Sequence, residues 1–404
     1  MNGISRKKSE KDNKLSLFVI FLSAQIVFYI INDDMYLQLS GSYIFILFAF
    51  IFGLPSFLKR LSKLTVQHLI VILCVVPSVA FSTVKSGVVE RGYFLSYIFL
   101  IMLLMYFLTL PFSNREISWI SKSYVTLALI ASFCIIVFQK RFYADEADRI
   151  SVQLFNNPIF DPNYLGATMV APFFISAYYA LENKRAETKA LWIFIGLIIA
   201  FGVFMTGSRG AMVSLASGIA IIFFGKTFNK KNRKHAFKII LGLIVVVGII
   251  MLMLPRQFYN RLFDFDSWLD SSNLRRFELW ENAILSIIKK PLFGYGIGST
   301  ATLIGQPAHN TFLEVCVHLG LFGGVLLIYF FVYAIFSKNN LYVKAIAFST
   351  LVWSIFVAAE MTLAFWLNIS FCVLLTNIEK KKKVKNGKYN RSRLQRGEIY
   401  KRVR

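Results

Sequence analysis

The stretch that decides the fold class is "ALWIFIGLIIAFGVFMTGSRGAMVSLASGIAIIFFG", residues 190–225. It consists of two apolar runs, 190–206 and 210–225, which a short turn containing Arg209 separates. A transmembrane helix needs about 20 mostly apolar residues, with a range of roughly 17–25, and both runs are close to that length. The sequence therefore predicts two adjacent spans, with one arginine at the membrane boundary between them.

The composition of the whole chain agrees with a membrane protein. Hydrophobic residues make up 56% of the 404 residues and charged residues 16%, against about 45–50% and about 25% in soluble proteins. The first apolar run ends near Ile31 without a small-residue cleavage site, so we expect a retained helix rather than a signal peptide. The cysteines lie far apart within apolar runs, which predicts buried free thiols. They are Cys74, Cys134, Cys316 and Cys372.

Further apolar runs extend this pattern to about twelve candidate spans and predict an all-α integral membrane protein. The candidate spans are residues 15–32, 41–58, 64–82, 93–112, 117–139, 162–181, 190–206, 210–225, 236–254, 309–336, 341–358 and 361–378. The expected organisation is a basic cytoplasmic N-terminus (1–14), nine spans (15–254), an extracytoplasmic loop with an amphipathic helix (255–308), three spans (309–378) and a polybasic cytoplasmic tail (379–404).

The net charge of +24 is concentrated in alternate connections between the spans. The connection "INDDMYL" (31–37), by contrast, has two Asp and no basic residue. By the positive-inside rule, both termini are cytoplasmic. The tail "EKKKKVKNGKYNRSRLQRGEIYKRVR" (379–404) is typical of attraction to anionic lipid. Because no binding fold or interleaved aromatic residues accompany it, it does not indicate nucleic-acid binding.

The loop 255–308 is longer than an ordinary connection, and loops longer than about 15 residues are usually functional or disordered. Apolar residues recur in it with helical spacing, at Phe277, Trp280, Ile284, Ile287 and Ile288. Residues 271–273 can cap such a helix and residues 289–291 can end it. We expect its apolar face to lie on the membrane surface or across the mouth of a cavity. The glycine-rich "GYGIGS" (294–299) follows no strand, so we interpret it as a flexible connection rather than a nucleotide-binding loop.

Arg209 on its own is typical of an interfacial arginine whose side chain reaches lipid headgroups. Gly207 and Gly210 flank it, however, and glycine permits a tight turn and the close approach of a bulky anion. Ser208 and the free N–H groups at the start of the following helix add donors that suit a phosphate. The turn is therefore either a lipid contact or an anion site.

Two arginines begin the loop helix in "NLRRFELWENAI" (273–284). Arg275 is explained as a solvated residue that pairs with Glu278, three residues further on. Arg276 precedes Trp280 by four residues, so its side chain can follow the apolar face toward the membrane. The residues alone leave solvation and function equally open for Arg276.

His309 opens the next span in "QPAHNTFLEVCVHLGLFGG" (306–324). It is either an ordinary helix-start histidine or an accessible imidazole that can change protonation. Nine residues at roughly 100° each turn His318 to the opposite face, which argues against a metal pair, and Glu314 is off the His309 face by about 140°. The stretch "DPNYLG" (161–166) predicts a helix start with Asp161 as its cap, and Asn163 is a further candidate for the same cavity.

Two or three arginines and one histidine, from distant parts of the sequence, are thus all predicted on the outer side of the membrane. Cationic side chains hold phosphate oxygens and stabilise a diphosphate as it leaves, and a histidine can take a proton from an attacking hydroxyl. The outer loops contain no D-x-D pair, no H-E-x-x-H and no nucleophile elbow. The pattern indicates transfer from a diphosphate carrier without a metal ion or another cofactor.

These motifs resemble those of the O-antigen ligase and polymerase superfamily of bacterial surface-polysaccharide enzymes. The resemblance is carried by "TGSRG" (206–210), "RFELWENA" (276–283), "KKPLFGYGIGS" (289–299) and "HNTFLEVCVHLGLFGG" (309–324), with "DPNYLG" as a further element. It covers roughly residues 155–335, and the N-terminal third is similar only in hydropathy.

The resemblance implies a lipid-carrier-dependent glycosyltransferase of the GT-C-like class, which moves a glycan from undecaprenyl diphosphate to an acceptor hydroxyl. Arg209 and Arg276 would hold the diphosphate, and His309 would activate or orient the acceptor. Because the two loop arginines are adjacent, either Arg275 or Arg276 can be the functional one. The expected substrate-binding residues are Arg275, Ser208, Asn310, Trp280 and Asn163.

Branches of this superfamily differ in the acceptor. Polymerases use another carrier-linked repeat unit and ligases use lipid A core, while a third group glycosylates proteins and tends to carry a larger C-terminal outer domain. We expect a polymerase of O-antigen or capsular repeat units in the bacterial plasma membrane, with the ligase as the alternative. A lipid-linked glycan transporter or flippase is the alternative of a different class, but transporters commonly show internal repeats, and no clear repeat is present.

The expected partners follow from this function. They are the undecaprenyl-diphosphate-linked glycan donor, the glycan acceptor and membrane lipids, with a chain-length regulator and a separate flippase as candidates and no nucleic acid.

Overall fold

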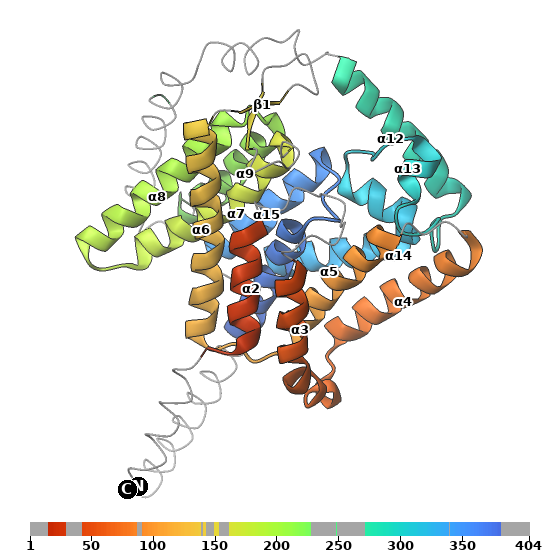
Figure 1. The fold of residues 1–404 in the computed structure, drawn as a ribbon, viewed down its shortest axis with the longest axis horizontal. Coiled ribbons are helices and arrows are strands. Elements are labelled where there is room, and N and C mark those ends of the chain that lie inside the picture. Colours follow the sequence, from red (N-terminus) through yellow and green to blue (C-terminus); the bar gives the residue numbers. More distant parts are fainter. Residues whose placement is uncertain are drawn as a thin grey trace, which may run out of the picture.

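The computed structural model describes residues 15–29, 43–86, 91–138, 140–142, 149–152, 161–227, 248, 271–338 and 340–380, and Figure 1 shows their arrangement. Within these ranges the regular structure is helical apart from one short hairpin. The hairpin pairs β1 (Lys140–Phe142) with β2 (Arg149–Ser151) in antiparallel fashion, with Arg141 opposite Ile150. It is the exception to the predicted all-α fold.

Each predicted span that falls in the described residues contains a helix, and two further helices, α12 and α13, lie in the predicted loop 255–308. The first group is α2 (Leu17–Phe28), α3 (Tyr43–Leu58), α4 (Val66–Ser86), α5 (Arg91–Thr109) and α6 (Asn114–Phe138), with a 3-10 turn at Leu61–Lys63. The second group is α7 (Pro162–Glu182), α8 (Ala186–Met205), α9 (Arg209–Thr227), α12 (Ser271–Lys289), α13 (Ser299–Ile304), α14 (Thr311–Phe336), α15 (Leu341–Phe356) and a last helix at 363–380. The predicted span 236–254 lies outside the described residues apart from residue 248, and the basic N-terminus and most of the basic tail lie outside them as well.

Several of these helices are long and apolar enough to cross a membrane. Within the described residues five qualify, namely α6, α7, α8, α9 and α14. The shorter apolar helices are Leu17–Phe28, Ile44–Leu58, Val66–Pro77, Phe94–Thr109 and Leu341–Phe356. A helix bonds its own backbone N–H and C=O groups, so it is the form that an apolar run takes where water is absent. The chain is a helical integral membrane protein, as its composition predicts.

The helices pack as neighbours around one apolar core. Helices α2, α3 and α6 stand side by side, α7, α8 and α9 pack together with α15, and α4 and α12 lie against α14 (Figure 1). Polar contacts also join helices inside the core. The Tyr124 hydroxyl donates to Asn368 Oδ1 at 2.9 Å, and Asn368 Nδ2 donates to Thr350 Oγ1 at 3.1 Å, in the manner of the side-chain hydrogen bonds that join membrane helices. All four cysteines are free, as predicted, although Cys316 is only half-buried.

Three helices begin at one end of the bundle, which we term the site end. They are α7, α9 and α14, starting at Pro162, Arg209 and Thr311, and the contacts that join their starts are given in the next subsection. Helix α9 runs from the site end to the opposite end. There Lys226 Nζ lies 3.4 Å from the hydroxyl of Tyr342 at the start of α15. Helices α9 and α15 therefore pack side by side in opposite directions.

Helix α14 is broken at Gly320, which has φ 70° and ψ −168°. The preceding segment 291–298 binds to α14 at this break, and the Tyr295 N–H donates to Val317 O at 2.8 Å. A Cβ atom at residue 320 would lie 2.1 Å from Leu292 O, so only glycine fits. The prediction that "GYGIGS" is a flexible connection is therefore wrong, because its backbone is hydrogen-bonded to α14.

Candidate functional site

The starts of α7 and α9 are joined by two of the predicted substrate-binding residues. Asp161 caps α7 as predicted, with its Oδ1 accepting the Asn163 N–H at 2.7 Å. The Ser208 hydroxyl then donates to Asn163 Oδ1 at 3.1 Å. Ser208 is buried and Asn163 half-buried. The only hydroxyl proton of Ser208 is therefore directed to Asn163 rather than to a bound anion.

The turn before α9 has the tight geometry that its glycines predict. Gly207 has φ 64°, which lies in the left-handed region that glycine adopts readily. Arg209 is the first residue of α9 and is half-buried. At Gly210 a Cβ atom would lie 3.0 Å from the Phe356 Cβ. The interpretation of Gly210 as room for an anion is therefore wrong, because this glycine serves the packing of α9 against the end of α15.

The segment that follows α15 holds the helix starts together. The Thr311 hydroxyl donates to Val357 O at 2.6 Å and accepts the Ala359 N–H at 2.9 Å. The Tyr164 hydroxyl donates to Ala358 O at 2.9 Å. These bonds tie the starts of α7 and α14 to one segment, and the packing of Phe356 on α9 adds the third helix. The structure thus brings the helix starts that carry Asn163, Arg209 and His309 to the same end of the bundle.

His309 lies in the turn that leads into α14. Its φ is 50°, and it is half-buried. Asn310 caps the helix, with its Oδ1 accepting the N–H groups of Phe312 at 3.0 Å and Leu313 at 3.2 Å. Asn310 was expected to bind substrate, but its side-chain oxygen is occupied by helix capping.

The loop helix α12 is anchored to this same turn. Trp280 Nε1 donates to Ala308 O, immediately before His309, at 2.9 Å. Arg276 lies one helical turn before Trp280 and is half-buried, whereas Arg275 is exposed. Residues four apart lie on one face of a helix, so the burial of Arg276 favours it over Arg275 as the loop arginine nearer the site end.

The predicted apolar face of α12 is only partly right. Phe277, Ile284 and Ile288 are 61%, 47% and 68% exposed, and they form an outward apolar stripe. Instead Ala283 is fully buried, in a cluster with Ala308 and Val317 against which Trp280 and Ile287 pack. The small Ala283 lets α12 approach α14 closely, a role that a pattern counted from large apolar residues does not predict.

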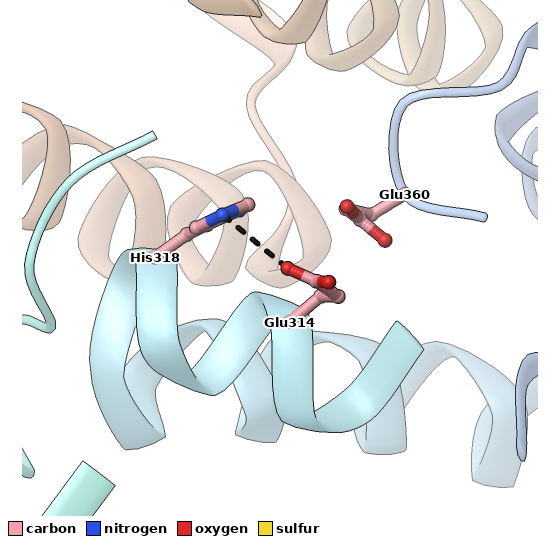
Figure 2. Close-up of side chains that lie close together, drawn as sticks. All are labelled: Glu314, His318 and Glu360. Atoms are coloured by element: carbon pink, nitrogen blue, oxygen red, sulfur yellow. Dashed lines mark ion pairs between the residues drawn. The ribbon is translucent and has the colours of Figure 1, made fainter. Parts of the chain in front are cut away.

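A cluster of buried polar groups lies behind the His309 turn, and sequence reasoning missed it. Glu314 and His318 project from the same face of α14, and Glu360 approaches from the segment after α15 (Figure 2). His318 Nε2 is 3.4 Å from Glu314 Oε2. The Thr300 hydroxyl, from α13, donates to Glu314 Oε2 and lies 2.6 Å from His318 Nε2. Because the hydroxyl has one proton, His318 donates its own Nε2–H to Thr300 in this arrangement.

This cluster is also the group that could hold a metal ion within the described part of the chain. Ligand atoms of Glu314, His318 and Glu360 all lie within 4.8 Å of one another. Burial raises the pKa of the Glu360 carboxyl well above its usual range, and the nearby Glu314 raises it further. In the sequence, His318 and Glu314 each lie off the predicted His309 face. The spacing of four residues between them was the signal that they share a face, whereas Thr300 and Glu360 come from other segments.

Comparison with known proteins connects this geometry to a family. A protein-family model described as O-antigen ligase matches residues 194–328, a range that includes Arg209, Arg276 and His309. An uncharacterized protein of Haemophilus influenzae is 26% identical over 300 residues, which cover 65% of this chain and 71% of that protein. The ComP-specific O-oligosaccharyltransferase of Acinetobacter baylyi is 25% identical over 182 residues, which cover 41% of this chain and 32% of that protein.

These matches confirm the predicted resemblance to the O-antigen ligase and polymerase superfamily. They agree with an integral membrane enzyme of the glycosyltransferase type, and they do not separate a ligase from a polymerase. The chain spans only about a third of the length of the Acinetobacter protein that it matches.

Proposed function

We propose that this chain is a polymerase of undecaprenyl-diphosphate-linked oligosaccharide repeat units that acts at the outer face of the bacterial plasma membrane. The donor is the carrier-linked glycan, and the acceptor is a hydroxyl of another carrier-linked repeat. The reaction needs no metal ion, since arginines supply the positive charge that a leaving diphosphate requires.

The observation that carries this proposal is the convergence of helix starts at the site end. The starts of α7, α9 and α14 are joined through Ser208, Thr311 and the segment 357–359. Helix α12, with the half-buried Arg276, is bonded to the residue before His309. This arrangement supports one site that draws on residues from distant parts of the sequence.

In the proposed reaction the donor enters sideways from the outer leaflet. Arg209 and Arg276 hold the two phosphates, and His309 takes the proton of the acceptor hydroxyl as its oxygen attacks the anomeric carbon. The new glycosidic bond forms as the bond to the diphosphate oxygen breaks, and undecaprenyl diphosphate leaves with that electron pair. Because attack and departure occur on opposite sides, the anomeric centre inverts.

The orientation in the membrane follows from charge. The end of the bundle opposite to the site end carries Lys226, Lys338, Lys344 and Lys380, and the basic tail follows. Basic connections are retained in the cytoplasm, which supports a cytoplasmic position for that end and an extracytoplasmic position for the site end.

The test is an assay with the purified full-length protein in a chelator, one synthetic undecaprenyl-diphosphate repeat unit, and substitutions of single arginines. We expect a ladder of longer carrier-linked glycans from the wild type. Removal of a preorganised charge that stabilises a transition state lowers turnover by about 10²–10³-fold, so Arg209→Ala and Arg276→Ala should largely abolish the ladder. Arg275→Ala, on the exposed face of the same helical turn, is the matched control and should retain it.

The same assay with other acceptors identifies the acceptor that the enzyme uses. Transfer to lipid A core without a ladder would replace the polymerase by the ligase. Because the Acinetobacter relative is named as specific for ComP, ComP is the third acceptor. If no acceptor is glycosylated while labelled carrier-linked glycan crosses the bilayer of proteoliposomes, the transporter replaces the enzyme.

A further inference from the structure

His309 has an unusual backbone conformation for a residue with a side chain. Within the described ranges it is the one non-glycine residue with a positive φ. The left-handed region crowds the Cβ atom of an L-residue, and such conformations persist only where the surrounding structure holds them. The contacts that hold His309 are therefore informative about its role.

Ala308, the residue before His309, is fixed through both of its backbone polar groups. The Ala308 N–H donates to Glu314 Oε1 at 2.5 Å, and Ala308 O accepts Trp280 Nε1 at 2.9 Å. The Ala308 side chain is fully buried against Ala283 and Val317. On the C-terminal side, Asn310 caps α14 and Thr311 is bonded to the segment after α15. Neither side of His309 can rotate to relax its φ without breaking these bonds.

The contact from Glu314 is not ordinary helix capping. In a capping box the residue three after the cap bonds the N–H of the cap itself. Here Asn310 already caps α14, and Glu314, four residues after the cap, reaches past it to Ala308. The bond therefore fixes the turn that precedes the helix rather than the helix start.

Glu314 is itself held firmly. Its side chain is 1% exposed, and its second oxygen accepts the hydroxyl of Thr300 next to His318. A single carboxylate thus joins α13, α14 and the His309 turn. A buried carboxylate with both oxygens hydrogen-bonded is oriented by those bonds.

We propose that Glu314 is the positioning residue of the site, and that its carboxylate holds the backbone N–H of Ala308 so that the His309 imidazole, on the next residue, faces the acceptor hydroxyl. This inference rests on the proposed function, in which His309 takes the acceptor proton. Trp280, from α12, donates to the carbonyl of the same residue, so the loop helix that carries Arg276 and the turn that carries His309 are held in fixed positions relative to each other. Glu314 touches neither the diphosphate nor the sugar.

The inference predicts a particular kinetic pattern in the full-length protein assayed with the synthetic repeat unit. Glu314→Leu should lower kcat, because a catalytic group displaced by about 1 Å loses on the order of 10²-fold. The KM for the donor should not change, since the arginines that hold the diphosphate are elsewhere. Glu314→Gln should retain most of the activity, because an amide oxygen still accepts the Ala308 N–H.

A second comparison separates positioning from general structural support. In a His309→Ala background Glu314→Leu should cause no further loss of residual turnover, whereas a role that does not act through His309 would lower it again. If Glu314→Leu does not fold, Trp280→Phe carries the test, since it removes the hydrogen bond to the Ala308 carbonyl, next to His309, and should likewise lower kcat at unchanged KM.

Several results would overturn the inference. These are an unchanged kcat in Glu314→Leu or in Trp280→Phe, or an additive loss in the His309→Ala background. Loss of wild-type activity in chelator that added Zn²⁺ restores would also overturn it, because the cluster would then be a metal site. If His309→Ala itself is fully active, the proposed function fails instead, so the two failures are distinguishable.

Discussion

Two turns at the site end each contain a residue with positive φ, but the residues differ. The turn before α9 places Gly207 at φ 64°, and the turn before α14 places His309 at φ 50°. At the first turn the residue of chemical interest, Arg209, lies two positions beyond the glycine and has ordinary helical geometry. At the second turn the residue of chemical interest itself occupies the left-handed position.

The difference lies in what holds each turn. Glycine adopts the left-handed region without steric crowding, so the α9 turn needs little support. A histidine there is strained by roughly 1–2 kcal/mol, and hydrogen bonds from Glu314 and Trp280 fix the N–H and C=O groups of the preceding residue, Ala308. The contacts around a strained residue therefore identify the groups that hold it in place, which here are Glu314 and Trp280.

The largest expected effect comes from making the two turns alike. His309→Gly removes the imidazole but allows the left-handed conformation, so turnover should fall by about 10²–10⁴-fold, the usual contribution of a general acid or base. The folded protein should be as stable as the wild type or slightly more stable, because the strain is relieved. Glycan ladder formation and the Tm in the same detergent measure the two effects.

His309→Ala is the matched control, because it removes the imidazole but keeps a Cβ atom. Both variants should be equally inactive, and the glycine variant should have the higher Tm. A lower Tm for His309→Gly than for His309→Ala would show that the left-handed conformation of His309 is not strained. The two turns would then not differ in strain.

An intermediate effect is expected at the other turn. Gly207→Ala places a Cβ atom in the left-handed region and should lower the free energy of unfolding by about 1–2 kcal/mol. Turnover per folded molecule should stay close to that of the wild type if the turn keeps its shape. Thermal unfolding together with activity normalised to folded protein tests this. A large loss of turnover without loss of stability would mean that the turn contacts substrate directly.

The smallest effect is expected from Glu360→Gln, on the segment that joins both turns. The pKa of Glu360 is raised in the folded protein by burial and by Glu314, so the neutral form is favoured and glutamine resembles it. A raised pKa means that the stability contribution is complete below the unfolded pKa of about 4.3 and is lost as pH rises through the folded pKa. The Tm of the wild type should therefore fall more between pH 4.5 and neutral pH than that of the variant.

Equal pH dependence in the two proteins would contradict this assignment. The turnover of Glu360→Gln near neutral pH should stay within about twofold of the wild-type value. This corresponds to roughly 0.4 kcal/mol in activation free energy. Asn368→Asp provides a contrast, because it adds a buried carboxyl in the core whereas Glu360→Gln removes one. The free energy of unfolding of Asn368→Asp should decrease as the pH rises.

Most of the helical fold could be predicted because hydropathy is a local property. The apolar runs give the helices within a few residues, and the cap signal gives the start of α7, whereas residues 271–273, predicted to cap α12, form its first turn. The kink of α14 could not be predicted, because Gly320 looks like any helix glycine until residues 291–296 bind beside it. The hairpin of β1 and β2 has too few residues to produce an alternating pattern.

The candidate site could be predicted only in part, for the same reason. Arg209 and His309 stand out because charged and titratable groups are rare in apolar sequence, whereas Arg276 was singled out by its position four residues before Trp280 on the predicted loop helix. Ser208 and Asn310 also make hydrogen bonds within the protein, to Asn163 and to the start of α14, which the sequence did not predict. The partners of Glu314 come from α13 and the segment before α14, and no local pattern links them.

The break at Gly320 also bears on biogenesis. The segment 291–298 precedes α14 in the chain, yet the carbonyl groups that it binds belong to α14, and Thr311 is fixed by residues that follow α15. During synthesis residues 291–296 therefore cannot form these hydrogen bonds until α14 has been made, and the His309 turn is not complete until residues 357–359 have followed α15. Assembly of the site is thus among the last steps of insertion, so a chain arrested before α15 would present the loop helix without a finished site.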